Sequence, residues 1–232
     1  MNQTPRIFAL HIGQTSKSND FQNDTNPDLR NALSGSLKSS QSKLGLLLTK
    51  YCIGLGCNIQ PEKIKIQKSP GGKPFWKNDG QFFFNIAHAN RWVICGTGNA
   101  EIGVDIEFIK RKSVASISSA FFSSQEQDYI NSESDKLRAF YKIWTLKESY
   151  LKCIGKGLNY PLKEFCVINR KYTKGYDPSQ KQDKFKFKSF ELGSEYLIGI
   201  CTKGKQLPKA IETISLSELI NTKDIEHDNY CS

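Results

Sequence analysis

The chain is organised around one stretch, Phe140-Tyr-Lys-Ile-Trp-Thr-Leu-Lys-Glu-Ser-Tyr-Leu-Lys-Cys-Ile-Gly-Lys-Gly-Leu158. Its apolar residues recur at helical spacing and two glycines punctuate its end, which predicts an amphipathic helix closed by a glycine turn. Trp144, Glu148 and Lys152 follow one another at four-residue intervals and therefore share one face. A carboxylate and an amine one turn apart can form a surface ion pair. They can equally be a metal ligand and a phosphate contact in a shared cleft, so the rest of the chain must decide.

The composition indicates a folded intracellular protein with an acidic partner. Of 232 residues, 38% are hydrophobic and 11% aromatic, enough for a substantial core. The net charge of +10 favours nucleic acid, an anionic surface, a polyphosphate ligand or an acidic protein as partner. The seven cysteines lack zinc-site spacing and suggest buried reduced thiols. We find no signal segment and no membrane-spanning run, and expect a cytoplasmic protein.

The first half of the sequence predicts a mixture of strands and one long helix. Alternating or apolar runs predict strands at residues 6–12, 62–68, 81–87, 92–98 and 102–108. Leucines at helical spacing predict a helix over residues 40–53, which Gly54 and Gly56 should end. Residues 69–74 have the composition of a turn.

The second half repeats this order. Cys153-Ile-Gly-Lys-Gly157 resembles Cys52-Ile-Gly-Leu-Gly56, and each closes an apolar helix. A strand candidate at 165–169 and a hairpin at 185–203 then correspond to the strand at 64–68 and the hairpin at 82–98. These likenesses can be chance similarity of apolar segments, or a duplication. Duplication predicts an α+β fold of two similar helix-plus-antiparallel-sheet lobes, residues 1–105 and 106–232, related by a pseudo-twofold with the active site in the cleft between them.

Two carboxylates stand side by side in Gly103-Val-Asp-Ile-Glu107. Asp105 and Glu107 point to one face of the predicted strand, where their charges repel unless a cation lies between them. Oxygen ligands alone favour Mg²⁺. A solvent-facing strand edge is the other interpretation, and the availability of Glu148 as a third carboxylate favours the cation.

Two further residues are weaker candidates. His88 ends the apolar strand Phe84-Asn-Ile-Ala-His88, where a histidine is more often structural than a ligand. Lys73 lies in Gly71-Gly-Lys-Pro74, whose glycines would let the backbone approach a phosphate, although it can also be an ordinary turn lysine.

Four motifs, taken in order, resemble those of the 4′-phosphopantetheinyl transferases: Gly72-Lys-Pro-Phe75, Phe84-Asn-Ile-Ala-His88, Gly103-Val-Asp-Ile-Glu107, and Trp144-Thr-Leu-Lys-Glu-Ser-Tyr-Leu-Lys152 with Gly155-Lys-Gly-Leu158. The length and apparent duplication are similar to the pseudodimeric type that activates surfactin synthetase, rather than the half-length trimeric type. The last two motifs together are highly specific, and neither alone would be.

The resemblance implies transfer of phosphopantetheine from coenzyme A to a serine of a carrier protein, releasing adenosine 3′,5′-bisphosphate. It implies Mg²⁺ held by Asp105, Glu107 and Glu148, with Glu148 also drawing the proton from the serine hydroxyl. Lys152 would reach the pyrophosphate and assist the leaving group. Lys73 and His88 would bind coenzyme A phosphates. Phosphoryl transfer depends mostly on such positioning and charge neutralisation.

The sequence departs from the family pattern at two places. Many relatives have serine before the histidine, where this chain has Ala87. Relatives also carry a basic cluster before the first helix to grip the 3′-phosphate, where this chain offers only Arg30, Lys38 and Lys43; of these Lys43 is our candidate. We expect Trp144 to pack beneath the site.

Glu126 has two open interpretations, an acidic residue near the metal or a helix-start glutamate after Ser123 or Ser124. The basic run at residues 170–190, with Lys184-Phe-Lys-Phe-Lys188, could dock an acidic carrier or protect a strand edge.

Two other functions remain open beside the transferase. One is a non-enzymatic nucleic-acid binder, suggested by charge alone and supported by no known signature. The other is an inactive relative that only binds carriers, against which the three carboxylates and Lys152 argue. We expect a monomer acting on an acyl or peptidyl carrier of fatty-acid, polyketide or nonribosomal peptide synthesis, with no nucleic acid and no membrane as partner.

Overall fold

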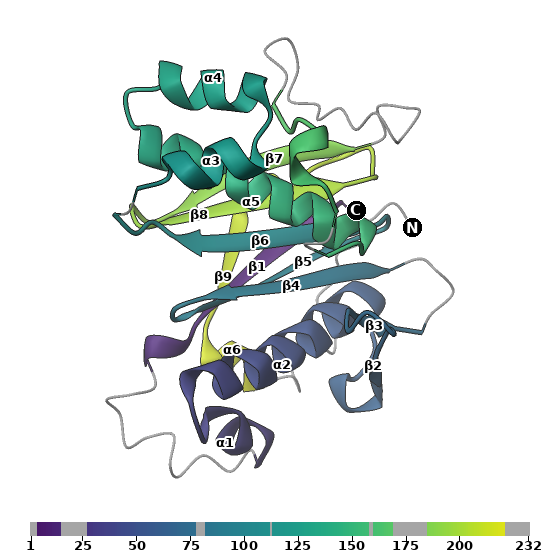
Figure 1. Ribbon diagram of the computed structural model, residues 1–232. Coiled ribbons are helices and arrows are strands. Elements are labelled where there is room, and N and C mark those ends of the chain that lie inside the picture. Colours follow the sequence, from purple (N-terminus) through teal and green to yellow (C-terminus); the bar gives the residue numbers. More distant parts are fainter. Residues whose placement is uncertain are drawn as a thin grey trace.

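A computed structural model describes residues 4–14, 27–77, 82–111, 113–157, 160–168 and 185–220. These residues form two sheets between two layers of helices, which confirms the predicted α+β class (Figure 1). The first sheet has the order β4 (Phe83–Ala89), β5 (Trp92–Gly98), β1 (Arg6–His11) and β9 (Ile211–Ile214). The second has the order β6 (Ile102–Phe108), β8 (Tyr196–Thr202) and β7 (Lys186–Leu192). Only β1 and β9 pair in parallel; the other pairings in these two sheets are antiparallel.

Helices cover the outer faces of both sheets. The long helices α2 (Leu37–Cys57) and α5 (Lys136–Ile154) lie on the first and the second sheet. On the side of α2 lie α1 (Pro27–Leu33) and α6 (Leu216–Ile220), and on the side of α5 lie α3 (Ala115–Phe121) and α4 (Ser124–Ser132) (Figure 1). A small hairpin of β2 (Ile66–Lys68) and β3 (Pro74–Trp76) stands beside the first sheet. Short 3-10 turns occupy Ile12–Gln14, Pro61–Lys63 and Leu162–Glu164. None of the described helices is long and apolar enough to cross a membrane.

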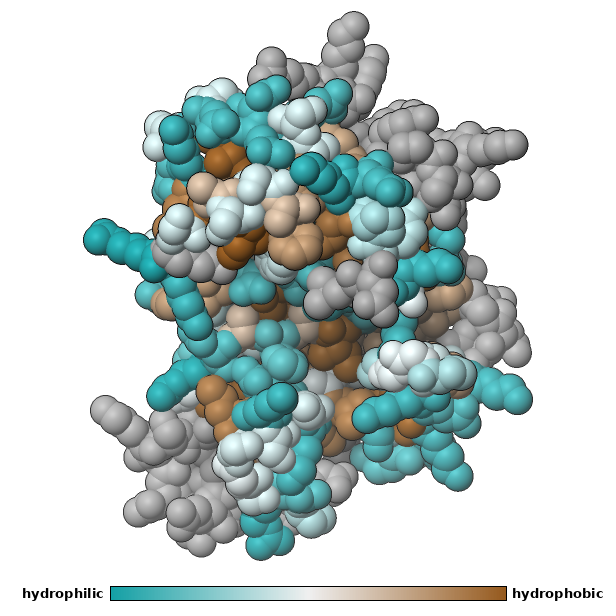
Figure 2. All heavy atoms as spheres, viewed as in Figure 1, coloured by the Kyte–Doolittle hydropathy of each residue, from teal (hydrophilic) through white to brown (hydrophobic). Residues whose placement is uncertain are grey.

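The apolar side chains fill three layers. One cluster lies between α2 and the first sheet, and includes Leu44 and Phe8. A second lies between α5 and the second sheet, and includes Tyr150. A third joins the facing sides of the two sheets, and includes Ile94 and Ile198. Hydrophilic residues occupy most of the face in Figure 2, and hydrophobic ones show mainly in its middle. The layer order is therefore helix, sheet, sheet, helix.

Two glycines let α5 lie directly on the second sheet. A Cβ atom at Gly103 would be 2.0 Å from the Ser149 carbonyl oxygen, and one at Gly199 would be 2.3 Å from the Thr145 carbonyl oxygen. Any larger residue would force the helix outward. The helix ends at Gly155, whose left-handed conformation (φ 70°) makes the predicted glycine turn.

The predicted end of the first helix is wrong. The helix begins at Leu37 and runs through Gly54 and Gly56 to Cys57. Its end is set by Asn58, which adopts the left-handed conformation at φ 53°. Gly56 is required for packing instead, because a Cβ atom there would lie 2.4 Å from the Phe82 ring. Gly56 therefore leaves space for the Phe82 ring and does not end the helix.

Two predicted strands are also largely wrong. In residues 62–68, the chain makes a 3-10 turn at Pro61–Lys63, and only Ile66–Lys68 is a strand. In residues 165–168 the structure has no regular strand, and residue 169 lies outside the described residues. There the Phe165 carbonyl accepts from Lys147 and the Val167 N–H donates to Glu126, so side chains replace the ladder partners of a strand.

The proposed division after residue 105 falls inside β6, and β9 and α6 return from the end of the described chain to the first sheet. The two-lobe division and its pseudo-twofold stay predictions.

Candidate active site

An ion pair between β6 and α5 lies at the centre of the candidate site. Lys152 Nζ is 2.7 Å from Asp105 Oδ1, although the residues are 47 positions apart. Asp105 is only 7% exposed, and no described residue donates to its buried Oδ2. Burial raises the pKa of the Asp105 carboxyl, and the Lys152 ammonium opposes that shift without cancelling it. Burial therefore disfavours the charged Asp105 carboxylate more than Lys152 stabilises it.

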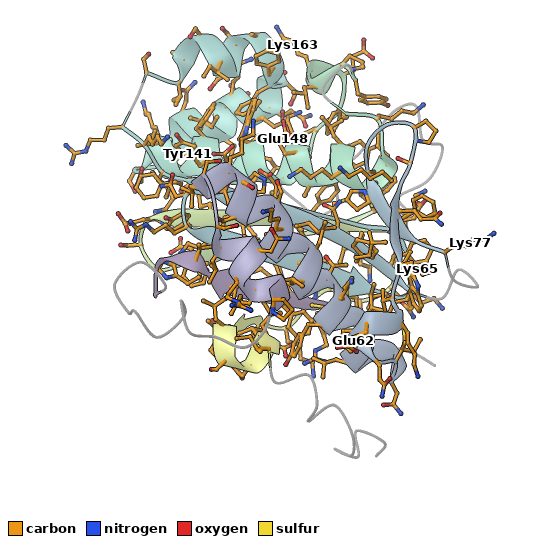
Figure 3. All side chains as sticks on the ribbon, turned by 90° about the horizontal axis from the view of Figure 1, so that it is seen from below. Glu62, Lys65, Lys77, Tyr141, Glu148 and Lys163 are labelled. Carbon is orange, nitrogen blue, oxygen red and sulfur yellow. The ribbon has the colours of Figure 1, made fainter. Side chains whose placement is uncertain are left out.

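Glu148, labelled in Figure 3, precedes Lys152 by one turn of α5 and therefore lies on the same face of the helix. The pKa of the Glu148 carboxyl is raised to about 7. Burial is the largest cause, the charge of Asp105 adds to it, and the charge of Glu107 adds a smaller part. Lys152 again opposes the shift. A carboxyl group with such a pKa exchanges its proton readily near neutral pH. The structure thus brings the three predicted carboxylates within electrostatic reach of one another.

His88 approaches the ion pair from β4. Burial, followed by the charge of Lys152, lowers the pKa of the His88 imidazole, while Asp105 acts in the opposite direction. The charge of Lys38, near the start of α2, also lowers it. His88 therefore lies within electrostatic reach of Lys38 on α2 and of Lys152 on α5.

Asn85, three residues before His88, was not predicted as a site residue. Its buried side-chain oxygen accepts a hydrogen bond from the Val104 N–H at 2.9 Å. Because Val104 directly precedes Asp105, this bond fixes β4 against β6 and sets the distance between His88 and Asp105. An asparagine within an otherwise apolar strand was the available signal.

Lys73 reaches the site from the turn between β2 and β3. Its ammonium group donates to the carbonyl oxygens of Lys152 at 2.5 Å and Cys153 at 3.4 Å. Burial lowers the pKa of the Lys73 ammonium group. Beside it is a cavity of about 250 Å³ lined by Ser69, Lys73, Pro74, Phe75, Trp76, Phe82, Phe83, Phe84, Glu101 and Ile102. The predicted phosphate-binding lysine is thus bonded to the end of α5.

Lys43 is engaged elsewhere. Its Nζ donates to the backbone oxygen of Asn31 at 2.7 Å and to the Asn31 side-chain oxygen at 2.9 Å, which joins α2 to α1. Of the three basic residues considered for the 3′-phosphate, Lys38 is the one whose charge acts on His88.

Glu126 and Lys147 form a fully buried ion pair at 2.8 Å. Glu126 Oε2 also accepts from the Ser123 N–H at 2.9 Å as part of a capping box, and Oε1 accepts from Val167 N–H at 2.9 Å. The helix-start interpretation of Glu126 is therefore correct. Lys147 was missed, although its position among Ile143, Leu146 and Tyr150 on the buried face of α5 could have marked it.

Trp144 belongs to an aromatic cluster. It stacks on Phe140, with ring centroids 6.1 Å apart, and meets Phe121 edge-on at 6.2 Å. Phe121 is 43% exposed, so the cluster reaches the surface. Trp144 thus supports the face of α5 that carries Glu148.

Two lysines of the predicted basic strand, Lys186 and Lys188 on β7, have partners in the structure. Lys188 Nζ donates to the Pro208 carbonyl at 2.8 Å, and Lys186 Nζ donates to the Lys205 carbonyl. These two lysines hold the segment that leads to β9. Residues 169–184 lie outside the described residues, so the predicted carrier-docking face stays a prediction.

The donor set fits a hard cation, although the described residues contain no group of three or more His, Cys, Asp or Glu side chains already gathered for a metal. Two observations support the fit: the buried Asp105 Oδ2 has no donor among the described residues, and neighbouring negative charge helps to raise the pKa of Glu148. A cation would satisfy both, and oxygen-only ligands are those of Mg²⁺.

Comparison with known proteins agrees with this arrangement. Residues 101–201 match the family model of the 4′-phosphopantetheinyl transferase superfamily. The chain is 33% identical to 4′-phosphopantetheinyl transferase gsp of Aneurinibacillus migulanus over 186 residues, covering 78% of this chain and 76% of the relative. It is 32% identical to 4′-phosphopantetheinyl transferase Sfp of Bacillus subtilis (strain 168) over 182 residues, covering 76% and 80%.

The chain therefore belongs to the 4′-phosphopantetheinyl transferase superfamily, of the type represented by gsp and Sfp, and to that class of enzyme. The matched segment begins just before β6 and ends in β8, so it contains Asp105, Glu148 and Lys152.

Proposed function

We propose that this chain transfers the 4′-phosphopantetheine group from coenzyme A to a serine of an acyl or peptidyl carrier protein, releasing adenosine 3′,5′-bisphosphate. The observation that carries the proposal is the Asp105–Lys152 ion pair beside Glu148, whose pKa is about 7. This arrangement offers a cation for a pyrophosphate and a proton acceptor for a hydroxyl group. Membership of the transferase superfamily supports the same reaction.

Asp105, Glu107 and Glu148 would hold Mg²⁺, which supplies Lewis-acid charge neutralisation at the pyrophosphate when bound. Glu148 accepts the proton of the carrier serine hydroxyl as an ionised carboxylate, the form that a bound cation would favour. Lys152 contacts the pyrophosphate and stabilises the leaving phosphate. Its ammonium group lies 2.7 Å from Asp105, one of the carboxylates that would hold the cation.

His88, Lys73 and Lys43 are proposed to contact coenzyme A. His88 has the best support, because the charges of Lys38 and Lys152 both act on it. An anion placed there would be attracted by two lysines and would favour the protonated imidazole. Lys38 is the more suitable residue of α2 for this role, since Lys43 is already bonded to Asn31.

A duplicated architecture is also part of the proposal. Burial and then the neighbouring Cys95 of β5 raise the pKa of Cys52 on α2, and burial and then the neighbouring Cys153 of α5 raise the pKa of Cys201 on β8. In both cases a cysteine near the end of the long helix lies close to a cysteine on an inner strand of the sheet that the helix covers. This repetition supports two similar lobes related by a pseudo-twofold, with the site at their junction.

We further propose a cytoplasmic monomer that acts on acidic carriers. The net charge of +10 supports an acidic partner, because opposite charge steers association. The six cysteines in the described residues are free thiols, which suits a reducing compartment. The two sheets pack on each other within one chain, so no second subunit is needed to cover them.

Intact-mass analysis of carrier proteins tests the function. We expect acyl and peptidyl carriers to gain one phosphopantetheine group when incubated with the wild type, coenzyme A and Mg²⁺. Glu148→Gln and Asp105→Asn should each lower the rate at least about 100-fold. Glu62→Gln is the matched control, since Glu62 is an exposed glutamate of the 3-10 turn before β2 (Figure 3).

A folded wild type that modifies no member of a broad carrier panel would overturn the proposal. Carrier binding without mass gain would instead identify a carrier-binding relative without catalysis. Salt-sensitive nucleic-acid binding with no response to coenzyme A would favour the non-enzymatic alternative.

A further inference from the structure

The C-terminal end of α5 has carbonyl groups that need donors from outside the helix. The last four carbonyls of a helix have no partner within it. At this end the N–H groups of Gly155 and Lys156 both bond the Leu151 carbonyl. The carbonyls of Lys152 and Cys153 accept instead from the ammonium group of Lys73, at 2.5 and 3.4 Å. A side chain 79 residues away in the sequence therefore completes the cap of this helix.

We propose that Lys73 is a positioning residue that fixes the end of α5 and thereby sets where Lys152 stands. This inference rests on the proposed transferase function only for its effect on the rate. A cation at this end also interacts favourably with the helix dipole. The contact gives Lys73 a role that does not require it to touch coenzyme A.

The turn that carries Lys73 is itself well fixed. The Ser69 N–H donates to the Lys73 carbonyl at 2.9 Å, and the Lys73 N–H donates to the Ser69 hydroxyl at 3.1 Å. Lys68 and Pro74 pair across the β2–β3 hairpin on either side of this turn. The backbone of Lys73 is thus held at both polar groups, so its side chain starts from a defined place.

Lys152 joins this support to the site. Its carbonyl oxygen is held by Lys73, and its ammonium group lies 2.7 Å from Asp105 on β6. Lys152 is therefore held at its backbone by the β2–β3 hairpin and at its side chain by β6. Without Lys73, the last turn of α5 would keep only its own cap at Gly155, and the starting point of the Lys152 side chain would vary.

Hydrogen exchange and kinetics together test this role. The variants are Lys73→Met, which removes the donor, and Lys73→Arg, which keeps a cation that can donate to two carbonyls. Lys65→Met is the control, because Lys65 is an exposed lysine close to the same hairpin (Figure 3). The measurements are amide exchange at Gly155 and Lys156, and kcat and KM for coenzyme A.

We expect Lys73→Met to speed exchange at these two amides about 10-fold and to lower kcat about 10- to 100-fold, whether or not the loss of a coenzyme A contact also raises KM. Lys73→Arg should restore most of both properties, and Lys65→Met should change neither. If Lys73→Met raises KM but leaves exchange and kcat unchanged, Lys73 is a substrate contact only and the positioning role is wrong.

The exchange result stands independently of the enzyme activity. If the wild type transfers nothing while Lys73→Met still loosens the end of α5, the proposed function fails and the capping role survives. If exchange is the same in the wild type and in Lys73→Met, the capping role fails whatever the kinetics show. Circular dichroism of each variant confirms that the fold is intact before these comparisons are made.

Discussion

Replacing the buried lysine of α5 tests how this fold holds its helices together. Lys147 is fully buried and forms an ion pair with Glu126 at 2.8 Å. It also donates to the carbonyl oxygens of Leu162 and Phe165, each at 2.6 Å. Lys147→Met keeps a side chain of similar length but leaves a buried carboxylate and two carbonyls without this donor. Removing one partner of a buried ion pair costs about 3–5 kcal/mol, so we expect the free energy of unfolding to fall by that amount.

Urea unfolding measures the change, with thermal unfolding as a second readout. For a chain of this size each kcal/mol lowers Tm by roughly 2–4 °C, so Lys147→Met should lower it by on the order of 10 °C. Lys163→Met is the matched control, because Lys163 is exposed and makes a hydrogen bond to Ser119 (Figure 3); we expect a loss below about 0.5 kcal/mol. Adding Glu126→Gln to Lys147→Met should recover part of the loss. A loss under about 1 kcal/mol in Lys147→Met would refute the reasoning.

Two further predictions concern α5 and its contacts. In metal-free buffer, we expect the free energy of unfolding to fall as pH rises from 4.5, the ordinary pKa of a glutamate, to about 7, the raised pKa of Glu148. The folded protein binds that proton more tightly than the unfolded chain, so urea unfolding of Glu148→Gln should lack this part of the pH dependence. Gly199→Ala should cost at least about 1–3 kcal/mol in urea unfolding, because its Cβ would lie 2.3 Å from the Thr145 backbone. Gly71→Ala, with 3.9 Å to its nearest neighbour, should change little.

Residues whose chemistry is decided by local spacing were predictable. Glu148 and Lys152 follow from the helical period of α5, and Asp105 follows from alternation in β6. The regular strands of both hairpins follow from the same rule. Apolar periodicity reports which face of an element is buried, and in β6 the buried polar residue that interrupts it, Asp105, lies at the site.

Features that depend on distant partners were not predictable. Gly56 does not end α2, because Phe82 packs against it from another part of the chain. Lys147 contradicts the rule that lysines lie at the surface, since Glu126 and two carbonyls compensate its burial. The contact between Lys73 and the end of α5 was not predictable, because nothing near Lys73 in the sequence indicates that helix end. Each of these contacts joins residues that are distant in the sequence and become neighbours only when the chain folds.

The paired cysteines allow the two proposed lobes to be compared position by position. Cys95 lies opposite Phe8 in the first sheet, and Cys201 lies opposite Gly103 in the second. Under the proposed duplication Phe8 corresponds to Gly103, which explains why α5 but not α2 can rest on the backbone of its strand here. A phenylalanine side chain fills the space that the glycine leaves open.

The same correspondence explains why one chain would carry one site. Two residues beyond Phe8 lies Leu10, which then corresponds to Asp105. On the helices, counting back from the cysteines, Leu47 corresponds to Glu148 and Tyr51 to Lys152. Leu10 is fully buried in the apolar cluster under α2, with Leu47 and Tyr51 packed against it. Under this proposal the first lobe lacks the charges of the second, and contributes His88 and Lys38 across the junction to a site that the second lobe supplies.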